Sequence, residues 1–444
     1  MKIRWQPVVF VRHENCESAI WAPRTGGCSI FKDAKSILVE VANEWRCVPE
    51  IVNNVASHFE IKPAEVEEDV KDVVEELSRQ GFIECIDDVE TGWNNGVATR
   101  GETGGCEDEG FPLDEFSIRH DLPIELHLDL TNSCTERCVH CYIPYNQKCF
   151  LPYEQGAKAI REFREMNGWT VYISGGECLM HPQFSDICRL CVELNLNFIV
   201  LTNLTLCDSR MAEFLAEVNP QFVNVSLYGM NANVHDSITN LPGSWRKTMS
   251  AIRLCQKSGV HCRIATPLLK ANKNEFSALR DFASENHMHL VPSWDIVPRC
   301  NHDAENLDYA CSATDLEEVM LAQKDIFREV IGDDDQGPNT KVCDIGQSRM
   351  YLSAEGNYYP CDCMHGYVLG NVRENTLSEI WHGEKLNYLR GLKNRDFGKC
   401  AQCEHRPWCK VCPAFNFNAT GDLFKTIPEK CRVSEVIHRV YGGR

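Results

Sequence analysis

The stretch TNSCTERCVHCY, residues 131–142, places cysteines at positions 134, 138 and 141. It follows an apolar segment, residues 124–130, that is typical of a buried strand. Three thiolates on one short loop suit three irons of a [4Fe–4S] cluster, for which thiolate is the preferred ligand. A structural zinc ion would need a closed set of four ligands, and His140, between two cysteines, would point elsewhere. The loop therefore predicts an iron–sulfur cluster with one iron open to a small molecule.

Short apolar strands alternate with amphipathic helices on the C-terminal side of this loop. The predicted strands cover residues 124–130, 170–174, 197–201, 222–227, 262–266 and 289–292. The predicted helices between them cover residues 153–166, 184–195, 208–218, 244–258 and 273–285. Six strand–helix steps predict an α/β fold, a partial (β/α)6 barrel, with its chemistry at the C-terminal ends of the strands.

Polar residues and glycines follow three of these strands. The second strand ends in Ser174-Gly175-Gly176-Glu177, the third ends at Asn203, and the fourth ends at Ser226. Glycine allows a close approach of the backbone, and a carboxylate is a natural partner for an ammonium group. We therefore expect a binding site for a small polar molecule beside the cysteine loop.

The cysteine spacing, with Tyr142 after the third cysteine, resembles the radical S-adenosylmethionine (SAM) superfamily. The resemblance implies that Cys134, Cys138 and Cys141 hold a [4Fe–4S] cluster whose open iron binds SAM. It also implies reductive cleavage of SAM to a 5′-deoxyadenosyl radical that abstracts a hydrogen atom from an unactivated carbon. The implied SAM contacts are Tyr142, Gly175, Gly176, Glu177, Asn203 and Ser226. Spacing does not select a general base among candidates such as Asp129, Tyr172 and Asp295.

A second group of cysteines lies near the C-terminus. Its pattern is Cys343-x12-Gly356-x4-Cys361, Cys400-x2-Cys403-x5-Cys409-x2-Cys412 and then Cys431. This resembles the SPASM extension of radical SAM peptide and protein maturases, with one residue fewer before Cys412. The resemblance implies two auxiliary [4Fe–4S] clusters, and three in all. The first would be held by Cys343, Cys361 and Cys412, and the second by Cys400, Cys403, Cys409 and Cys431.

Two alternatives stay open for these cysteines. Either Cys363 completes the first auxiliary set, or one iron of that cluster is open to a substrate thiolate or another group. Zinc ribbons are the other use of CxxC pairs, although five residues between the pairs are few for a ribbon. The remaining scattered cysteines, among them Cys188, Cys191, Cys255 and Cys262, are expected to be small buried apolar side chains.

Residues 1–86 predict a separate winged-helix-like domain. Strands are expected at 8–11, 18–22 and 82–86, and helices at 36–45, 49–59 and from Pro63 to Gly81. The third helix has an acidic face, which argues against DNA as a ligand. The pattern resembles PqqD-like precursor-recognition domains, which implies that a leader peptide adds a strand to this domain. Residues 87–122 are predicted as a linker, 123–310 as the radical SAM barrel and 311–444 as the SPASM domain.

The composition limits the partners of the chain. It has 444 residues, 25 cysteines and a formal net charge of −19. That charge argues against nucleic acid and anionic membranes as partners. We see no secretion signal and no stretch of roughly 18–20 apolar residues, so we expect a cytoplasmic protein with reduced thiols.

These features together predict a radical SAM maturase that installs an intramolecular cross-link in a ribosomally synthesised precursor peptide. The bond would be a thioether or a carbon–carbon bond, and an open auxiliary iron would favour the thioether. The expected electron donor is a flavodoxin or a ferredoxin. The alternatives are a protein side-chain oxidase, a peptide epimerase, or a zinc-binding protein that recruits peptides without chemistry.

Overall fold

The computed structural model describes residues 1–6, 9–23, 27–86, 112–143, 148–331, 337–442. The chain divides into two compact units, Met1–Ile124 and Glu125–Arg444. Each unit is described by itself below.

The second unit is built on a mostly parallel sheet. Among the described residues it has nine strands in the order β12-β11-β10-β9-β8-β7-β13-β14-β15. The six strands of the predicted barrel run parallel, each beside the one before it. They are β7 (Glu125–Asp129), β8 (Thr170–Ser174), β9 (Asn197–Thr202), β10 (Val223–Ser226), β11 (Cys262–Pro267) and β12 (His289–Ser293). The predicted α/β partial barrel is confirmed.

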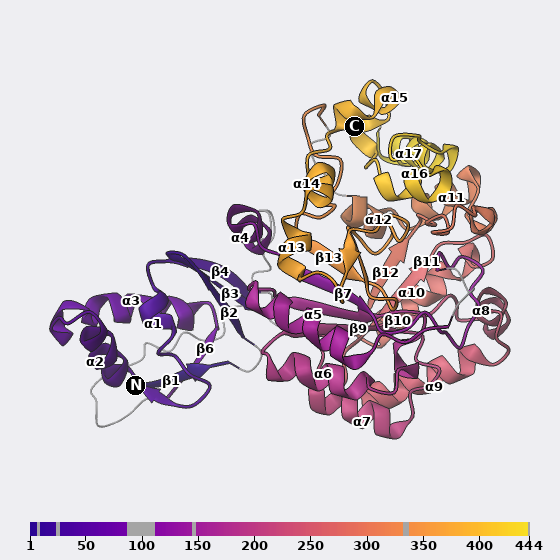
Figure 1. The fold of residues 1–444 in the computed structure, drawn as a ribbon. Helices are drawn as coiled ribbons and strands as arrows, with labels where there is room; N and C mark the ends of the chain where they lie inside the picture. The colour runs from indigo at the N-terminus through magenta and orange to yellow at the C-terminus, as the bar shows by residue number, and fades with distance from the viewer. Residues whose placement is uncertain (7–8, 24–26, 87–111, 144–147, 332–336, 443–444) are drawn as a thin grey trace. The chain divides into compact units, whose positions relative to one another are not determined.

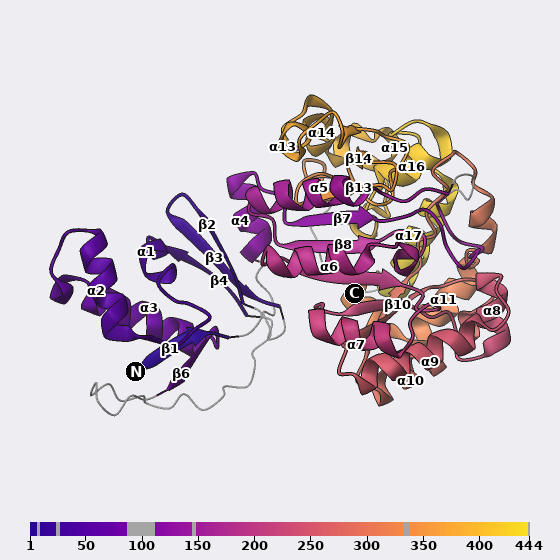
Figure 2. The same ribbon diagram turned by 60° about the horizontal axis from the view of Figure 1, so that its bottom comes forward.

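Helices connect these strands and lie along one side of the sheet (Figures 1 and 2). Those that match the prediction are α5 (Tyr153–Glu165), α6 (Phe184–Glu193), α7 (Ser209–Val218), α9 (Ser244–Lys257) and α10 (Phe276–Glu285). The sequence did not predict α8 (Ala232–Thr239), which has only eight residues. Asn231 caps its first turn and Asn240 ends it in the left-handed conformation, so local polar side chains define this helix.

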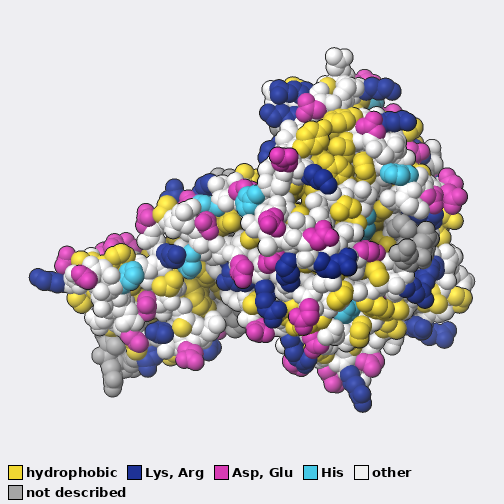
Figure 3. Space-filling model, viewed as in Figure 1, with side chains coloured by type: hydrophobic (Ala, Val, Ile, Leu, Met, Phe, Trp, Pro, Cys, Tyr) yellow, Lys and Arg dark blue, Asp and Glu magenta, His cyan; other side chains and the backbone are white. Residues whose placement is uncertain are grey.

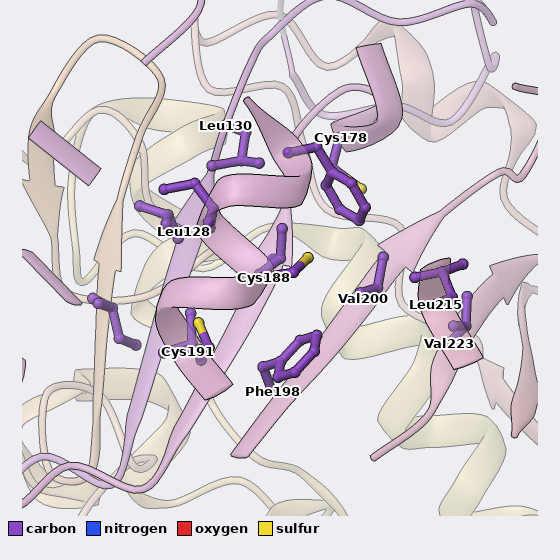
Figure 4. Close-up of a cluster of buried hydrophobic side chains, with 14 of the residues drawn as sticks. Leu128, Leu130, Cys178, Cys188, Cys191, Phe198, Val200, Leu215 and Val223 are labelled. Carbon is purple, nitrogen blue, oxygen red and sulfur yellow. The ribbon is translucent and has the colours of Figure 1, made fainter. Parts of the chain in front are cut away.

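Part of the hydrophobic core of this unit lies between α6 and the sheet (Figure 4). Leu128, Phe198 and Val200 project from the strands, and Cys188 and Cys191 project from α6. All five are 2% exposed or less. Cys255 and Cys262 belong to the same core, so the expectation that scattered cysteines pack as small apolar side chains is confirmed for these four. It is wrong for Cys16, which is exposed.

The cysteine-rich region begins as an extension of the barrel sheet. Strand β13 (Arg349–Leu352) runs parallel to β7, and β14 (Asn357–Tyr359) and β15 (Gly370–Asn371) follow antiparallel. The helices of this region are α11 (Ala313–Ala322), α12 (Lys324–Ile331), α13 (Leu377–Trp381), α14 (Glu384–Arg390), α15 (Gly398–Ala401), α16 (Pro413–Thr420) and α17 (Pro428–Tyr441). The first strand of the barrel is therefore flanked by both β8 and the cysteine-rich region.

The first unit contains two three-stranded sheets and short helices. One sheet has β1 (Lys2–Trp5) between β5 (Arg46–Cys47) and β6 (Ile83–Ile86). The other has β3 (Glu17–Ala22) between β2 (Phe10–Glu14) and β4 (Gly27–Lys32). Helices α2 (Val48–His58) and α3 (Glu67–Arg79) match the predicted second and third helices. Strands β1, β4 and β5 were not predicted.

The helix predicted over residues 36–45 is much shorter in the structure, where α1 spans Lys35–Leu38. The prediction was wrong beyond that point because the chain turns back toward β1. The backbone N–H of Trp5 donates to the carbonyl of Ala42 at 2.9 Å. Val39 and Val41, both β-branched, add little helix propensity to oppose that turn.

Part of the predicted linker is folded. Residues 87–111 lie outside the described residues, whereas α4 (Pro112–His120) is a helix of the first unit. Glu17 on β3 is 5% exposed and accepts hydrogen bonds from Arg119 at 2.5 and 2.6 Å. His120 Nε2 lies 2.9 Å from the same carboxylate. These contacts to His120 and Arg119 lower the pKa of Glu17, and they fix α4 to the β2-β3-β4 sheet.

The described part of the chain has no helix that is long and apolar enough to span a membrane. In the view of Figure 3, acidic and basic side chains are interspersed on the surface, and hydrophobic side chains gather near the C-terminal elements. Tyr388 and Phe424 are among the exposed large apolar residues of that region.

Candidate active site

A cavity of about 190 Å³ lies where β8, β9 and β10 end, beside the cysteine loop. It brings together seven of the predicted site residues: Cys134, Cys138, Cys141, Gly175, Gly176, Asn203 and Ser226. Its other lining residues are Asn132, Glu136, His140, Ile143, Ser174, Leu201, Thr202 and Tyr228. The polar strand ends and the cysteine loop thus form one site, as the barrel topology requires.

Two glycines allow the loop after β8 to press against the cysteine loop. Gly175 has φ +133°, and a Cβ on it would lie 2.3 Å from the carbonyl oxygen of Thr131. A Cβ on Gly176 would lie 2.4 Å from the carbonyl oxygen of Ser133. The backbone N–H of Gly176 donates to Thr131 at 2.7 Å, and that of Glu177 donates to Ser133 at 2.8 Å. Only glycine fits at these two positions.

The carboxylate of Glu177 accepts hydrogen bonds from neighbouring groups of the protein. Its Oε1 accepts from the hydroxyl of Thr202 at 2.6 Å and from the N–H of Leu179 at 3.0 Å. Its Oε2 accepts from the N–H of Asn203 at 2.8 Å. The residue is 0% exposed and does not line the cavity. The contact of Glu177 with the SAM amino group stays a prediction.

Asn203 connects this buried carboxylate to the cysteine loop. Its side-chain nitrogen lies 3.6 Å from the sulfur of Cys134 and 3.1 Å from the hydroxyl of Thr135. Its side-chain oxygen accepts from the N–H of Thr205 at 3.0 Å. The amide orientation is therefore fixed, with its donor toward the cysteine sulfur.

The loop cysteines are poor acids in this site. Burial raises the pKa of Cys134 to about 12 and that of Cys138 well above its ordinary value. A buried thiol of this kind ionises when a bound cation offsets the cost of burying the negative charge. Iron is such a cation for a cysteine thiolate. Ser133 Oγ and His140 Nδ1 have no hydrogen-bond partner in the part of the chain that the structure describes. With the three cysteines and the glycine cradle, they fit a cluster with a small polar ligand.

Three of the other lining residues carry titratable side chains that the sequence reasoning did not assign to the site. Glu136 is 2% exposed, and burial raises its pKa to about 8. Burial lowers the pKa of His140 to about 4, so this ring is neutral. The hydroxyl of Tyr228 lies 3.7 Å from the sulfur of Cys138. Tyr228 follows Ser226 by two positions at a strand end, a spacing that could have identified it.

Tyr142 is not among the residues that line the cavity. Its ring is edge-on to that of His365, with 5.6 Å between centroids, and its carbonyl accepts from the N–H of Cys300 at 3.2 Å. The contact of Tyr142 with SAM stays a prediction.

The C-terminal cysteines fall into two electrostatic groups, in each of which the thiols raise one another's pKa. Burial raises the pKa of Cys343 to about 12, and the nearby Cys412 adds to this shift. Burial, Asp362 and Cys412 raise the pKa of Cys361, and burial, Asp362, Cys361 and Cys412 raise that of Cys363. Cys412 therefore lies with the upstream cysteines, although its sequence neighbour is Cys409.

The second group holds the remaining four cysteines. Burial raises the pKa of Cys400, and Cys409, Cys431 and Cys403 add to the shift. The pKa of Cys431 is raised by burial and then by Cys409 and Cys403. Cys412 thus has neighbours among the upstream cysteines, and the assignment of the cysteines to two clusters stays a prediction. Within the described ranges, no three or more His, Cys, Asp or Glu side chains are arranged to hold a single metal ion.

The three general-base candidates all have partners. Asp129 is buried and accepts from the hydroxyl of Tyr351, and burial raises its pKa well above the ordinary range. The hydroxyl of Tyr172 donates to Glu125 at 3.3 Å, and Lys430 lies 2.5 Å from Asp295. None of the three lines the cavity.

Two segments of the chain match known protein families. Residues 128–283 match the radical SAM superfamily, and residues 343–405 match SPASM, an iron–sulfur cluster-binding domain. The chain carries a radical SAM domain followed by a SPASM domain. The radical SAM match contains the cavity, and the SPASM match contains Cys343, Cys361, Cys363, Cys400 and Cys403.

Relatives of this chain include enzymes of different stated function. It is similar to an AdoMet-dependent heme synthase of Methanosarcina barkeri, with 26% identity over 68% of this chain and 94% of the relative. It is also similar to the antilisterial bacteriocin subtilosin biosynthesis protein AlbA of Bacillus subtilis, with 24% identity over 66% and 67% of the two chains. The structure of Streptococcus suis SuiB bound to precursor peptide SuiA has a TM-score of 0.65 at 15% identity, over 96% of this chain and 99% of that one. This last likeness describes the fold.

Proposed function

We propose that the protein is a radical SAM maturase that installs an intramolecular cross-link in a ribosomally synthesised precursor peptide. The observation that carries this proposal is the likeness to peptide-bound SuiB, which extends over 96% of the chain and so includes the first unit. The similarity to the heme synthase leaves roughly a third of this chain outside the match. In this proposal the first unit holds the leader of the substrate by adding it as a strand to a sheet edge.

Cys134, Cys138 and Cys141 would hold the SAM-binding cluster, and the cavity beside them would hold SAM. When bound, the cluster and SAM supply a 5′-deoxyadenosyl radical that abstracts hydrogen. Gly175 and Gly176 position their strand end against the cysteine loop, and Asn203 holds its amide toward the Cys134 sulfur. These residues shape the site and exclude water from it.

The C-terminal groups would hold two auxiliary [4Fe–4S] clusters. Cys343, Cys361 and Cys412 would bind the first, and Cys363 would complete it because its thiol belongs to the same electrostatic group. Cys400, Cys403, Cys409 and Cys431 would bind the second. With Cys363 as a ligand, the preference for a thioether disappears, and the product is a thioether or a carbon–carbon bond.

The reaction balances as an oxidation of the peptide. The peptide loses one hydrogen atom to the 5′-deoxyadenosyl radical, giving 5′-deoxyadenosine. It then loses one proton to a base and one electron to an auxiliary cluster as the new bond forms. The modified peptide is lighter than its precursor by two hydrogens. A flavodoxin or ferredoxin would supply the electron that starts each cycle, and the proposed location is the cytoplasm, where thiols stay reduced.

A second candidate function is radical chemistry on a tetrapyrrole. The similarity to the heme synthase, which covers 94% of that relative, favours it. A side-chain oxidase and a peptide epimerase use the same cofactors and remain alternatives within radical SAM chemistry.

The substrate class is tested by what stimulates the formation of 5′-deoxyadenosine. Reconstituted enzyme is given SAM and a reductant with a precursor peptide encoded beside the gene, or with an iron porphyrin. The proposal predicts faster SAM cleavage with the peptide and no change with the porphyrin. The reverse result would assign the protein to tetrapyrrole chemistry, and zinc in place of about twelve irons per chain would exclude the enzyme.

A further inference from the structure

A largely buried ion pair joins the end of the barrel sheet to the last helix of the chain. Asp295 follows β12, and Lys430 lies in the first turn of α17. Lys430 Nζ lies 2.5 Å from Asp295 Oδ2, and the Lys430 side chain is 15% exposed. Asp295 Oδ1 is buried and has no hydrogen-bond partner in the described part of the chain. Burying two charges costs solvation, so such a pair is weak evidence for stability. Its charges act strongly on neighbouring groups, because water screens them less than it screens surface charges.

Lys430 lies among the elements that carry the proposed auxiliary-cluster ligands. It directly precedes Cys431 in the chain. Its Nζ lies 5.3 Å from the ring centroid of Phe415, in the first turn of α16. Cys412 is the N-cap residue of that helix. Lys430 is therefore next in sequence to a cysteine of the second proposed set, and it contacts the helix that begins at a cysteine of the first.

The charge of Lys430 acts on Cys412 more strongly than the charge of Asp295 does. Burial raises the pKa of the Cys412 thiol, Lys430 opposes this shift, and the smaller effect of Asp295 adds to it. The ion pair thus gives a net positive potential at this sulfur. A positive potential that stabilises a thiolate also stabilises an additional electron on a cluster which that thiolate binds, because net charge and surroundings set cluster potentials.

We propose that Lys430 raises the reduction potential of the first auxiliary cluster and that Asp295 holds its ammonium group in place. Lys430 is not a ligand of the cluster and acts through its charge alone. In the proposed function, the peptide radical loses one proton to a base and one electron to this cluster as the new bond forms. The inference rests on that function, and it assigns to Lys430 the stabilisation of the negative charge that the cluster gains.

The test measures midpoint potentials by redox titration monitored by electron paramagnetic resonance. The full chain with Cys134→Ala, Cys138→Ala and Cys141→Ala serves as the background, so that only auxiliary clusters give signals. The first auxiliary cluster is identified as the one whose signal is lost or altered when Cys412→Ser is added.

Lys430→Met should make the first auxiliary cluster harder to reduce. The equilibrium constant for its one-electron reduction should fall about tenfold, which lowers the midpoint potential by about 59 mV. Lys430→Arg keeps the charge and should change the potential less. Lys425→Met is the matched control, because Lys425 is exposed and solvent screens its charge, so the potential should not change.

Asp295→Asn should shift the potential in the opposite direction. This variant leaves the charge of Lys430 uncompensated, so the first auxiliary cluster should become easier to reduce. A purely structural role of the ion pair does not predict two shifts of opposite sign. Unchanged potentials in Lys430→Met and Asp295→Asn, or shifts of the same sign, would overturn the inference.

Two further results keep the test decisive. If Lys430→Met does not assemble its auxiliary clusters, Asp295→Asn decides alone, since a raised potential supports the inference and an unchanged or lowered one overturns it. If the potentials shift as expected but wild-type enzyme leaves the precursor peptide unmodified, the proposed function fails and the inference about Lys430 holds. The two failures are therefore distinguishable.

Discussion

The backbone N–H of Asn203 donates to Oε2 of Glu177 at 2.8 Å, which joins the end of β9 to the loop after β8. The same carboxylate accepts from Thr202 and Leu179, so one buried side chain organises the edge of the cavity. Asn203 then presents its amide to the sulfur of Cys134 at 3.6 Å. The position of a loop cysteine therefore depends on a carboxylate that does not face the cavity.

The first prediction concerns this carboxylate. In Glu177→Gln, either orientation of the new amide places an NH₂ group against a fixed backbone N–H, that of Leu179 or that of Asn203. The free energy of unfolding should fall by about 1–3 kcal/mol, the cost of an unsatisfied buried polar group. Chemical denaturation measures it. The exposed Glu154→Gln is the control and should change stability by less than about 0.5 kcal/mol.

The glycine cradle gives the second prediction. Gly176→Ala would place a Cβ 2.4 Å from the carbonyl oxygen of Ser133, so the cysteine loop must shift. The purified variant should contain fewer irons in its SAM-binding cluster and should melt at a lower temperature. Gly259→Ala is the control, since that position has φ +82° but nothing within 4 Å of an added Cβ. It should lose about 1–2 kcal/mol from backbone strain and keep its iron. Equal iron losses in both variants would argue against a steric role for Gly176.

The two groups of C-terminal cysteines give the third prediction. Cys412→Ser should remove or alter the auxiliary cluster shared with Cys343, and Cys409→Ser should affect the cluster shared with Cys431. The double variant Cys343→Ser/Cys412→Ser should therefore lose no more iron than either single variant, because both residues belong to one cluster. Cys409→Ser/Cys412→Ser should lose both auxiliary clusters. Mössbauer spectroscopy with iron analysis distinguishes these outcomes, and additive losses in the first pair would contradict the interleaved grouping.

A fourth prediction concerns the pH dependence of α4. Hydrogen bonds from His120 and Arg119 lower the pKa of Glu17 below its ordinary value of 4.5. The contribution of Glu17 to stability is therefore present above that value and is lost as pH falls through the lowered pKa. Hydrogen exchange of residues 112–120 in the full chain should be slower in the wild type than in Glu17→Gln at neutral pH. After correction for intrinsic exchange rates, this difference should shrink on acidification. A difference that stays constant would show that α4 is held by other contacts.

Much of the barrel follows from sequence because its strands and helices each carry a clear apolar period. The predicted strand at residues 170–174 is reproduced at both ends, and the glycines at 175 and 176 are needed for the close approach that their sequence context suggested. Short elements without such a period, such as β1 and α8, depend on partners distant in the chain and were missed.

The candidate site was also predicted only in part from the sequence. The motif identifies the cysteines, but it does not show where a carboxylate points. Glu177 occupies the expected position in sequence and turns toward Thr202 and Asn203, whereas Glu136 turns toward the cavity. That difference arises from tertiary hydrogen bonds that no local pattern encodes.

The central claim is that this protein oxidises a precursor peptide by removing two hydrogens through SAM-derived radical chemistry. The most direct test is the mass of the peptide after incubation with reconstituted enzyme, SAM and a reductant, using a peptide deuterated on its side-chain and α carbons. The account predicts a cross-linked product lighter than the precursor by one deuterium and one further hydrogen isotope, and 5′-deoxyadenosine that carries deuterium. Cleavage of SAM with an unchanged peptide mass, or deuterium transfer without a cross-link, would contradict it.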